Sequence, residues 1–260
     1  VVNDLGGSVD GTGANASAAQ VVVDEIKAAG GEAVADHNSV ATPEGGAAIV
    51  QTAIDAYGRV DIVVNNAGIL RDKAFHNMTP DLLNPVLDVH LKGAFYVTQP
   101  AFVHMREQGY GRIISTSSAA GVFGNFGQTN YGAAKGGIAS FTIIAADELG
   151  RYGVTVNAIA PAAFTRLTAD LGLGDAPEEV KEAMSTKWIS PIAVWLASEE
   201  SSEVTGRVFD VRGELLAISE SWHQGPKVTN TLDPSAVGPL VEELMGKARP
   251  NADMLGLDRK

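Results

Sequence analysis

Strand and helix signals alternate along this chain, and that alternation constrains its fold more than any other feature. Short apolar, β-branched runs at residues 60–64 and 154–159 are typical of buried parallel strands. Longer segments between such runs carry helix-start signals, as where Thr42-Pro43-Glu44 combines a capping residue, a proline and a first-turn acid. The pattern predicts an α/β fold with a doubly wound parallel sheet.

The expected strands and helices follow from these runs and from the turn and capping residues between them. Strands are expected at residues 1–3, 32–35, 60–64, 112–116, 154–159 and 207–211. Helices are expected at residues 16–29, 42–58, 79–108, 129–149 and 237–247. Residues 1–213 would form the main domain, and residues 214–260, which contain four prolines, would form a carboxyl-terminal extension or linker.

Composition excludes several classes of function. The 260 residues carry a net charge of −12, which argues against nucleic acid and anionic membrane as partners. No run reaches the ~18 apolar residues of a membrane span. The absence of cysteine excludes disulfides, thiolate catalysis and zinc–thiolate sites. No GxSxG or HExxH motif occurs, and the histidines show no metal-ligand spacing, so no metal is expected.

Ser118, Tyr131 and Lys135 are the candidate catalytic residues. A lysine four residues after a tyrosine lies on the same helical face, and its ammonium would lower the tyrosine's pKa. Ser118 ends an apolar run and can supply a hydroxyl to the same site. The combination suits proton transfer to or from a substrate oxygen. A surface Tyr/Lys pair is the simpler alternative, since the YxxxK spacing is common.

A second motif, Asn65-Asn66-Ala67-Gly68, follows the apolar run at residues 60–64. Small residues at the carboxyl end of a strand let a ligand approach closely, and ligands bind at these ends in open α/β sheets. The motif therefore favours a binding site, although alone it could be a plain turn.

Together these motifs resemble the short-chain dehydrogenase/reductase family over nearly the whole chain. Within it, the likeness is greatest to the (3R)-hydroxyacyl-CoA dehydrogenase domain of type 2 multifunctional enzymes of β-oxidation. The segments that carry this likeness are VVNDLGG at 1–7, NNAGILRD at 65–72, VHLKG at 89–93, residues 110–135 and NAIAP at 157–161. The resemblance implies a Rossmann-like fold and hydride transfer between NAD and a secondary alcohol.

The resemblance also implies roles for individual residues. Tyr131 would be the general acid–base, Lys135 would hold the nicotinamide ribose, and Ser118 would bind the substrate oxygen. His90 stands where the family usually has an asparagine that anchors a relay water, and this histidine is typical of the multifunctional subgroup. A buried histidine bonded to a backbone carbonyl remains an equal alternative for His90.

Cofactor contacts are implied at several further positions. Asp4, at a strand end, would accept hydrogen bonds from the adenosine ribose and repel a 2′-phosphate, which favours NAD over NADP. Asn38 and Ser39 would lie near the adenine, and the motif at residues 65–68 along the cofactor. Pro161, Ala162 and Thr165 would cover the nicotinamide, with Ala162 in place of the family's usual glycine.

The beginning of the chain departs from the family pattern. Residue 1 lies in what resembles the second strand, so the first strand and the glycine-rich phosphate loop are expected to be missing from this sequence. The sheet would then have an open slot, and NAD would bind poorly. Alternatively, residues 7–13 could form the phosphate loop, with Asp36 on the ribose; Asp10 makes this less favourable because it would repel a pyrophosphate.

Three functions remain open. The first is oxidation of (3R)-hydroxyacyl-CoA by NAD, and the second is the same chemistry on another secondary alcohol, such as a steroid hydroxyl. The third is a non-catalytic, truncated interaction subunit. The expected partners are an acyl-CoA substrate and copies of the same chain in a homodimer or homotetramer. The protein would be cytoplasmic in a bacterium and peroxisomal in a eukaryote.

Overall fold

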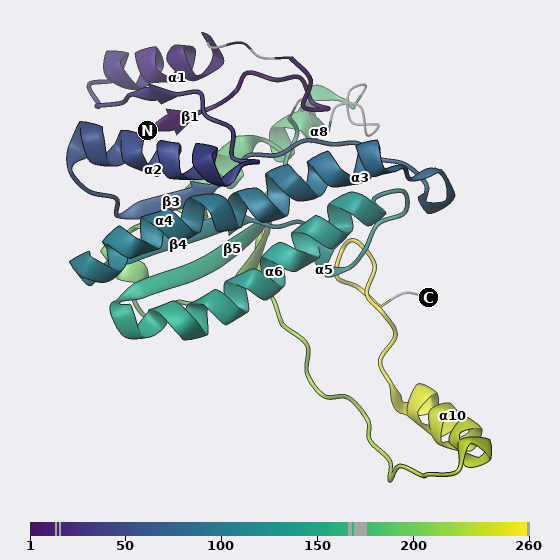
Figure 1. The fold of residues 1–260 in the computed structure, drawn as a ribbon. Coiled ribbons are helices and arrows are strands. Elements are labelled where there is room, and N and C mark those ends of the chain that lie inside the picture. Colours follow the sequence, from purple (N-terminus) through teal and green to yellow (C-terminus); the bar gives the residue numbers. More distant parts are fainter. Residues whose placement is uncertain (14, 16, 166–167, 169–175, 259–260) are drawn as a thin grey trace.

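The computed structural model describes residues 1–13, 15, 17–165, 168 and 176–258. Its central sheet contains β3 (Ile62–Asn65), β4 (Gly111–Thr116), β5 (Val154–Ala162), β6 (Val208–Arg212) and β7 (Leu215–Ser219), in that spatial order (Figure 1). The first four strands are parallel, and β7 pairs with β6 in the antiparallel direction. The predicted α/β fold with a mostly parallel, Rossmann-like sheet is confirmed.

Helices cover both faces of this sheet. On the face toward the viewer in Figure 1 lie α2 (Pro43–Tyr57), α4 (Gly93–Gln108) and α6 (Thr129–Leu149). On the other face, α9 (Ser190–Ala197) packs on β4, β5 and β6 through Ile192 and Leu196. The main core joins the first group of helices to the sheet, and its largest fully buried members include Met105, Ile113, Val154 and Val156.

One predicted helix is divided in the structure. The segment predicted as a single helix at 79–108 contains α3 (Pro80–Leu87), a π-helical turn (Asp88–Lys92) and α4. Other helices in the described ranges are α1 (Ser17–Ala28), α5 (Ala119–Val122) and α8 (Glu178–Ala183). Short 3₁₀ turns lie at Phe75–Asn77, Gly150–Tyr152, Thr186–Trp188, Glu199–Ser201 and Pro234–Ala236. No helix in the described ranges is long and apolar enough to cross a membrane.

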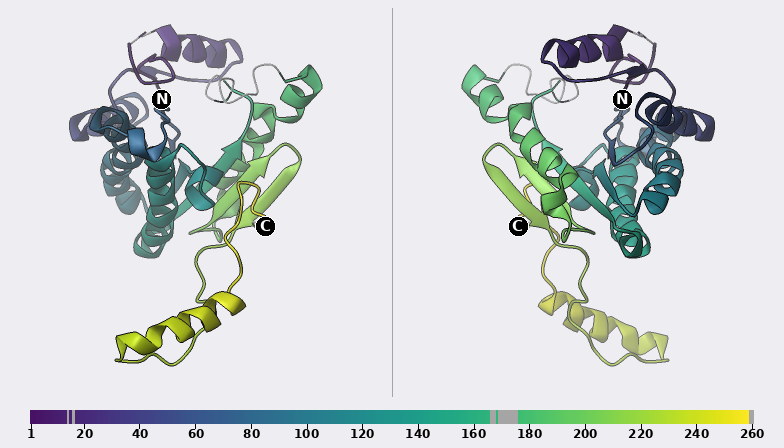
Figure 2. Two further views of the ribbon diagram at one scale, coloured as in Figure 1. Left: turned by 90° about the vertical axis from the view of Figure 1, so that its right-hand side faces the viewer. Right: turned by 90° about the vertical axis from the view of Figure 1, so that its left-hand side faces the viewer.

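The chain extends the sheet beyond residue 213, where the predicted main domain ends, because β7 occupies residues 215–219. After β7, an extended segment leads to α10 (Val237–Lys247), which projects away from the body (Figure 2). The chain then returns, and Arg212 Nη2 donates to the Leu255 carbonyl at 2.8 Å. The segment after β7 is thus an arm anchored at both ends, and the domain division at 213 remains a prediction.

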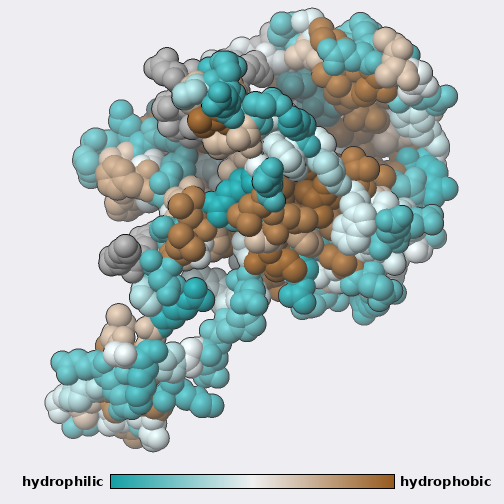
Figure 3. Space-filling model, turned by 180° about the vertical axis from the view of Figure 1, so that it is seen from behind, coloured by the Kyte–Doolittle hydropathy of each residue, from teal (hydrophilic) through white to brown (hydrophobic). Residues whose placement is uncertain are grey.

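The sheet is interrupted on the side of β3. Two short strands, β1 (Val2–Asn3) and β2 (Ala35–Asp36), form a separate parallel pair rather than joining the main sheet. Val63 of β3 is buried against α4, whereas its neighbours Ile62 and Val64 are 45% and 52% exposed. Figure 3 shows apolar side chains gathered on the middle of the face opposite that of Figure 1. The slot between β1 and β3 is therefore open.

Candidate active site

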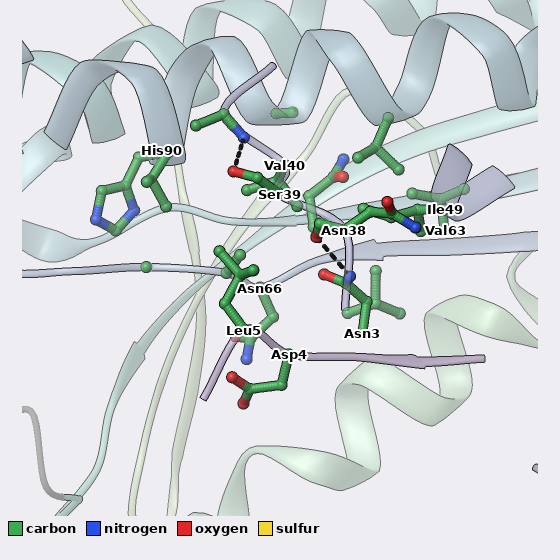
Figure 4. A pocket seen from close by; sticks show the side chains of 18 of the residues that line it. Asn3, Asp4, Leu5, Asn38, Ser39, Val40, Ile49, Val63, Asn66 and His90 are labelled. Carbon is green, nitrogen blue, oxygen red and sulfur yellow. Dashed lines mark hydrogen bonds between the residues drawn. The ribbon is translucent and has the colours of Figure 1, made fainter. Parts of the chain in front are cut away.

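A cavity of about 920 Å³ lies between the β1–β2 pair and β3, and extends along the whole of β3 to its carboxyl end. Figure 4 shows Asp4 and Asn66 beside it, with His90 at the end away from Val63 and Ile49. Ten residues that the sequence analysis singled out line this cavity: Asp4, Asn38, Ser39, Asn65, Asn66, Ala67, Gly68, His90, Lys135 and Thr165. Folding thus brings together positions spread over more than half of the chain.

Tyr131 meets Lys135 and His90, and the latter two line the cavity. Tyr131 and Lys135 lie one turn apart near the start of α6, and the Lys135 Nζ is 5.6 Å from the centre of the Tyr131 ring. The His90 ring meets the Tyr131 ring edge-on, with centroids 5.2 Å apart. The Lys135 ammonium donates to the Thr116 carbonyl at 2.5 Å, which ties it to the end of β4.

Ser118 reaches Tyr131 from the segment that follows β4. Its hydroxyl caps α5 by accepting a hydrogen bond from the Ala120 N–H at 3.1 Å, and it also bonds the Tyr131 side chain. The preceding residue, Ser117, donates to the Lys135 carbonyl at 2.8 Å. These contacts hold the start of α5 against α6, so the three candidate catalytic residues form one cluster.

Burial has the largest effect on the electrostatics of this cluster. Burial lowers the pKa of Lys135 to about 7, because the charged amine loses its contact with water. Burial raises the pKa of Tyr131, while its hydrogen bond with Ser118 acts in the opposite direction and the charge of Asp72 adds to the increase. Burial is thus the largest effect on the pKa of Tyr131 in this structure, and the lowering of that pKa by a protonated Lys135 stays a prediction.

His90 lies in the π-helical turn, and the sequence contains no signal that predicts this turn. π-Helical turns interrupt regular helices and occur frequently at functional sites. The Nε2 of His90 lies 3.0 Å from the Ile69 nitrogen and 2.8 Å from the Ile69 oxygen. Burial, with a smaller effect from Lys135, lowers the pKa of His90 to about 3, so the ring is neutral at physiological pH. Its contact with a backbone carbonyl matches the structural alternative given above.

The two asparagines at the end of β3 connect neighbouring elements. The Asn65 amide donates to Thr98 of α4 at 3.0 Å and to Ser115 of β4 at 3.2 Å. Asn66 Oδ1 accepts a hydrogen bond from Thr116 at 2.9 Å. At Gly68, an added Cβ would lie 2.5 Å from the His90 ring, so only glycine lets the chain pass this close. The motif therefore shapes the cavity wall.

The loop after β1 supplies Asp4 and the glycine-rich segment at 7–13. Asp4 is exposed and accepts a hydrogen bond from the Gly6 N–H at 2.6 Å. Asp10 Oδ1 accepts from the Ser8 hydroxyl, the Thr12 hydroxyl and the Thr12 N–H, and these bonds lower its pKa to about 2. An ionised carboxylate thus occupies a backbone donor that a phosphate would need, which disfavours this loop as a phosphate site.

Asp36 does not face the cavity. It is buried, and its carboxylate accepts hydrogen bonds from Asn3, Asn38 and Thr52 at 2.7–2.9 Å. It joins β1, β2 and α2 and has no free oxygen directed at a ribose. The alternative in which Asp36 binds the cofactor is therefore unsupported by the geometry.

The remaining candidates lie around the cavity. Asn38 lines it, but its amide donates to Asp36 at 2.9 Å. Ser39 accepts from the Ala41 N–H at 3.2 Å. Pro161 and Ala162 end β5, next to β6, and are not among the lining residues, nor are Ser118 and Tyr131. The Thr165 N–H donates to the Thr168 hydroxyl at 2.8 Å.

Two residues that the sequence analysis gave no role also meet beside Tyr131. The Gln128 Nε2 donates to Asp72 Oδ2 at 2.6 Å, although the residues are 56 positions apart. No local pattern pairs them, since neither lies in a periodic segment. Only the juxtaposition of the two loops reveals the contact.

Comparison with known proteins agrees with this geometry. Residues 4–172 match the family described as short chain dehydrogenase. The chain is 46% identical over 211 residues to peroxisomal multifunctional enzyme type 2 of Mus musculus. That match covers 81% of this chain and 28% of the mouse enzyme. It is 38% identical over 238 residues to a hydroxyacyl-CoA dehydrogenase of Mycobacterium tuberculosis, covering 86% of this chain and 72% of the relative.

A solved structure extends the comparison to the whole fold. The crystal structure of a short chain dehydrogenase from Mycobacterium avium superposes with a TM-score of 0.85 at 44% identity, covering all of this chain and 89% of the other. The matched residues include the ends of β3 and β4 and the start of α6, which carry the candidate site. The chain therefore belongs to the short-chain dehydrogenase family of oxidoreductases.

Proposed function

We propose that this protein oxidises a secondary alcohol with NAD, and that its substrate is a (3R)-hydroxyacyl-CoA, which becomes a 3-oxoacyl-CoA. The observation that carries the proposal is the cluster of Ser118, Tyr131 and Lys135, of which Lys135 lines the cavity together with residues 65–68. The names of the mouse and M. tuberculosis relatives support the substrate class.

In the proposed mechanism, the substrate hydroxyl lies between Ser118 and Tyr131. Ser118 orients the oxygen and stabilises the charge that develops on it. Tyr131, as the phenolate, accepts the hydroxyl proton. Lys135 stabilises the phenolate when protonated, and its pKa of about 7 lets it release a proton near neutral pH. A bound nicotinamide would accept the hydride from the substrate carbon. His90 is neutral and supports the Tyr131 ring edge-on.

The residues present fit a dinucleotide at its two ends. Asp4 is exposed beside the cavity and would bind the adenosine ribose, with Asn38 and Ser39 nearby. Residues 65–68 and Lys135 would hold the nicotinamide ribose, and Pro161, Ala162 and Thr165 would lie over the ring. The pyrophosphate has a poorer fit, since Asp10 occupies the donor at Thr12. We therefore expect weak NAD binding by this chain, and assays need millimolar cofactor.

Substrate choice can be tested by following NADH formation at 340 nm with three alcohols. We expect turnover of (3R)-hydroxybutyryl-CoA or longer homologues and little with the (3S) enantiomers. A steroid alcohol is the alternative substrate. Preference for that steroid would replace the acyl-CoA assignment, and lack of activity with every alcohol would favour a non-catalytic role in binding.

Cofactor choice depends on Asp4. We expect NAD to be preferred over NADP by roughly tenfold or more, because the carboxylate repels a 2′-phosphate. The double variant Asp4→Ala/Leu5→Arg should narrow or reverse this preference, since Leu5 also lines the cavity. Asp55→Ala, which removes an exposed acid on α2, is the matched control. If the unmodified protein preferred NADP, the role of Asp4 would have to be abandoned.

The same proposal extends to partners and location. Exposed apolar residues on α4 and α6, namely Phe95, Val103 and Ile144, would pack against their copies in a homodimer or homotetramer. In a two-fold interface both subunits contribute the same surface patch. The protein would act in the cytoplasm of a bacterium or in the peroxisome of a eukaryote, as the name of the mouse relative suggests.

A further inference from the structure

We infer that Asp72 is a positioning residue for Tyr131: through Gln128 it holds the first turn of α6, and it places a buried carboxylate near the phenol. The catalytic consequence of this inference depends on the proposed function of Tyr131. The structural and titration effects do not, because they can be measured without substrate or cofactor.

The geometric part of the argument concerns how α6 begins. Gln128 is the residue that precedes α6, it is buried, and its side chain makes no capping bond to the helix. Instead, its Nε2 donates to Asp72 at 2.6 Å, and its Oε1 accepts from Asn125 at 2.9 Å. Tyr131 follows three residues later. The bond to Asp72 therefore helps to hold the start of the helix, and with it the phenol, in place.

Backbone contacts hold the same two loops together. The Lys73 N–H donates to the Gly127 carbonyl at 2.9 Å, and the Asn130 amide donates to the carbonyls of Arg71 at 2.8 Å and Leu82 at 3.0 Å. The Asn130 Oδ1 in turn accepts from the Tyr131 N–H at 2.8 Å. Because these bonds fix the loops independently, the carboxylate of Asp72 is held in place even when its charge is changed.

The electrostatic part concerns the second carboxylate oxygen. Asp72 Oδ1 is buried without a hydrogen-bond partner, so the charge of the group is poorly compensated by the protein. Burial raises the pKa of Asp72, and its charge in turn raises the pKa of Tyr131. Arg71, the adjacent cation, points elsewhere: its guanidinium donates to the carbonyls of Asp10 and Asp81.

Other groups around the phenol do not provide the same effect. His90 has a pKa of about 3 and is neutral. Lys135, with a pKa of about 7, is the remaining titratable group in contact with the ring. The apolar side chains packed around Tyr131 come from α3, the π-helical turn, α6 and the strand end: Val86, Leu87, Val89, Leu91, Ala134 and Ile69. Among the described residues packed here, Asp72 is thus the acid that opposes ionisation of the phenol.

This arrangement has a chemical use. A phenol with raised proton affinity is a stronger base once it has ionised, but a smaller fraction of it is ionised near neutral pH, so base catalysis works best where the pKa approaches the working pH. Asp72 raises this affinity and Lys135 offsets it when protonated. The balance between the two would set the pH at which alcohol oxidation begins.

The test uses Asp72→Asn in the 260-residue chain, because asparagine keeps an oxygen that can accept from Gln128 and removes only the charge. The phenol is titrated by NMR of protein labelled with ¹³C at the tyrosine Cζ, with Tyr131 assigned by its loss in Tyr131→Phe. We expect the Tyr131 signal in Asp72→Asn to begin titrating at lower pH, with roughly two- to fivefold more phenolate at a given pH below the midpoint. Asp81→Asn, an exposed acid in the first turn of α3, should titrate as the unmodified chain does.

A second variant separates positioning from charge. Gln128→Leu keeps the Asp72 charge and removes the hydrogen bond, so it should lower the melting temperature and broaden the Tyr131 signal. If the Tyr131 signal of Asp72→Asn titrates at the same pH as that of the unmodified chain, the electrostatic role of Asp72 is refuted. If Gln128→Leu leaves both stability and signal unchanged, the positioning role is refuted. Absence of oxidation in the unmodified chain would instead count against the proposed function, while the titration would still decide the role of Asp72.

Discussion

Tyr131→Phe is expected to lower the rate of alcohol oxidation by ~10²–10⁴-fold, because it removes the group that accepts the substrate proton. The fold should persist, since the ring packs among Val86, Ala134 and neighbouring side chains through its carbon atoms. The hydroxyl itself contributes the bond with Ser118. The rate should be measured at millimolar NAD with saturating substrate, and the fold by circular dichroism and thermal unfolding.

Tyr152→Phe is the matched control for this variant. Tyr152 follows α6 at its other end, and its ring packs on Phe102 with centroids 5.6 Å apart. Tyr152→Phe removes the same hydroxyl group far from the cavity residues. The rate of alcohol oxidation by this variant should therefore stay within about twofold of that of the unmodified chain. Near-normal turnover by Tyr131→Phe would show that another group performs the proton transfer.

Gly121→Ala is expected to destabilise the protein by about 1–3 kcal/mol and to reduce activity, because both effects follow from a displacement of α5 relative to α6. A Cβ at residue 121 would lie 2.5 Å from the Gly136 nitrogen and 2.5 Å from the Lys135 carbonyl carbon. Both neighbours are backbone atoms of α6, so relief requires α5 to move away from α6. Since α5 begins at Ser118, that movement would separate the serine from Tyr131 and Lys135.

Gly150→Ala provides the comparison for this prediction. Gly150 lies just after α6 with a φ of −55°, and an added Cβ there would meet nothing within 4 Å. Its melting temperature should equal or slightly exceed that of the unmodified chain, because alanine restricts the unfolded state. Equal melting temperatures for the two alanine variants would mean that α5 and α6 tolerate separation, contrary to the close packing described above.

Much of the fold could be predicted from local signals. The helix at Thr129–Leu149 has the predicted bounds, and the Thr42 hydroxyl caps α2 by accepting from the Gly45 N–H, as the Thr-Pro-Glu sequence indicates. The strand runs before Asn65 and after Gly153 were also evident, because buried parallel strands are continuous apolar segments. Such features depend on contacts within a few residues, so the sequence expresses them directly.

Features created by distant contacts were less evident. The π-helical turn around His90 interrupts a region that has uniform helical character in the sequence. β7 was not predicted, because its five residues carry no strong strand signal of their own. They form a strand by pairing with β6 across a short turn. The predicted strand at residues 32–35 is displaced to Ala35–Asp36, where pairing with β1 and the bonds to Asp36 determine its position.

The sequence by itself determined the alternating fold, the grouping of Ser118, Tyr131 and Lys135, and the position of the Asn65–Gly68 motif at a strand end, since each follows from spacing along a regular element. Only the tertiary structure decided the electrostatics. Burial is the largest effect on the proton affinity of Tyr131, and Asp72 acquired its partner Gln128 from a loop distant in sequence. Desolvation and charge depend on what folding places around a group, and a linear pattern does not record that.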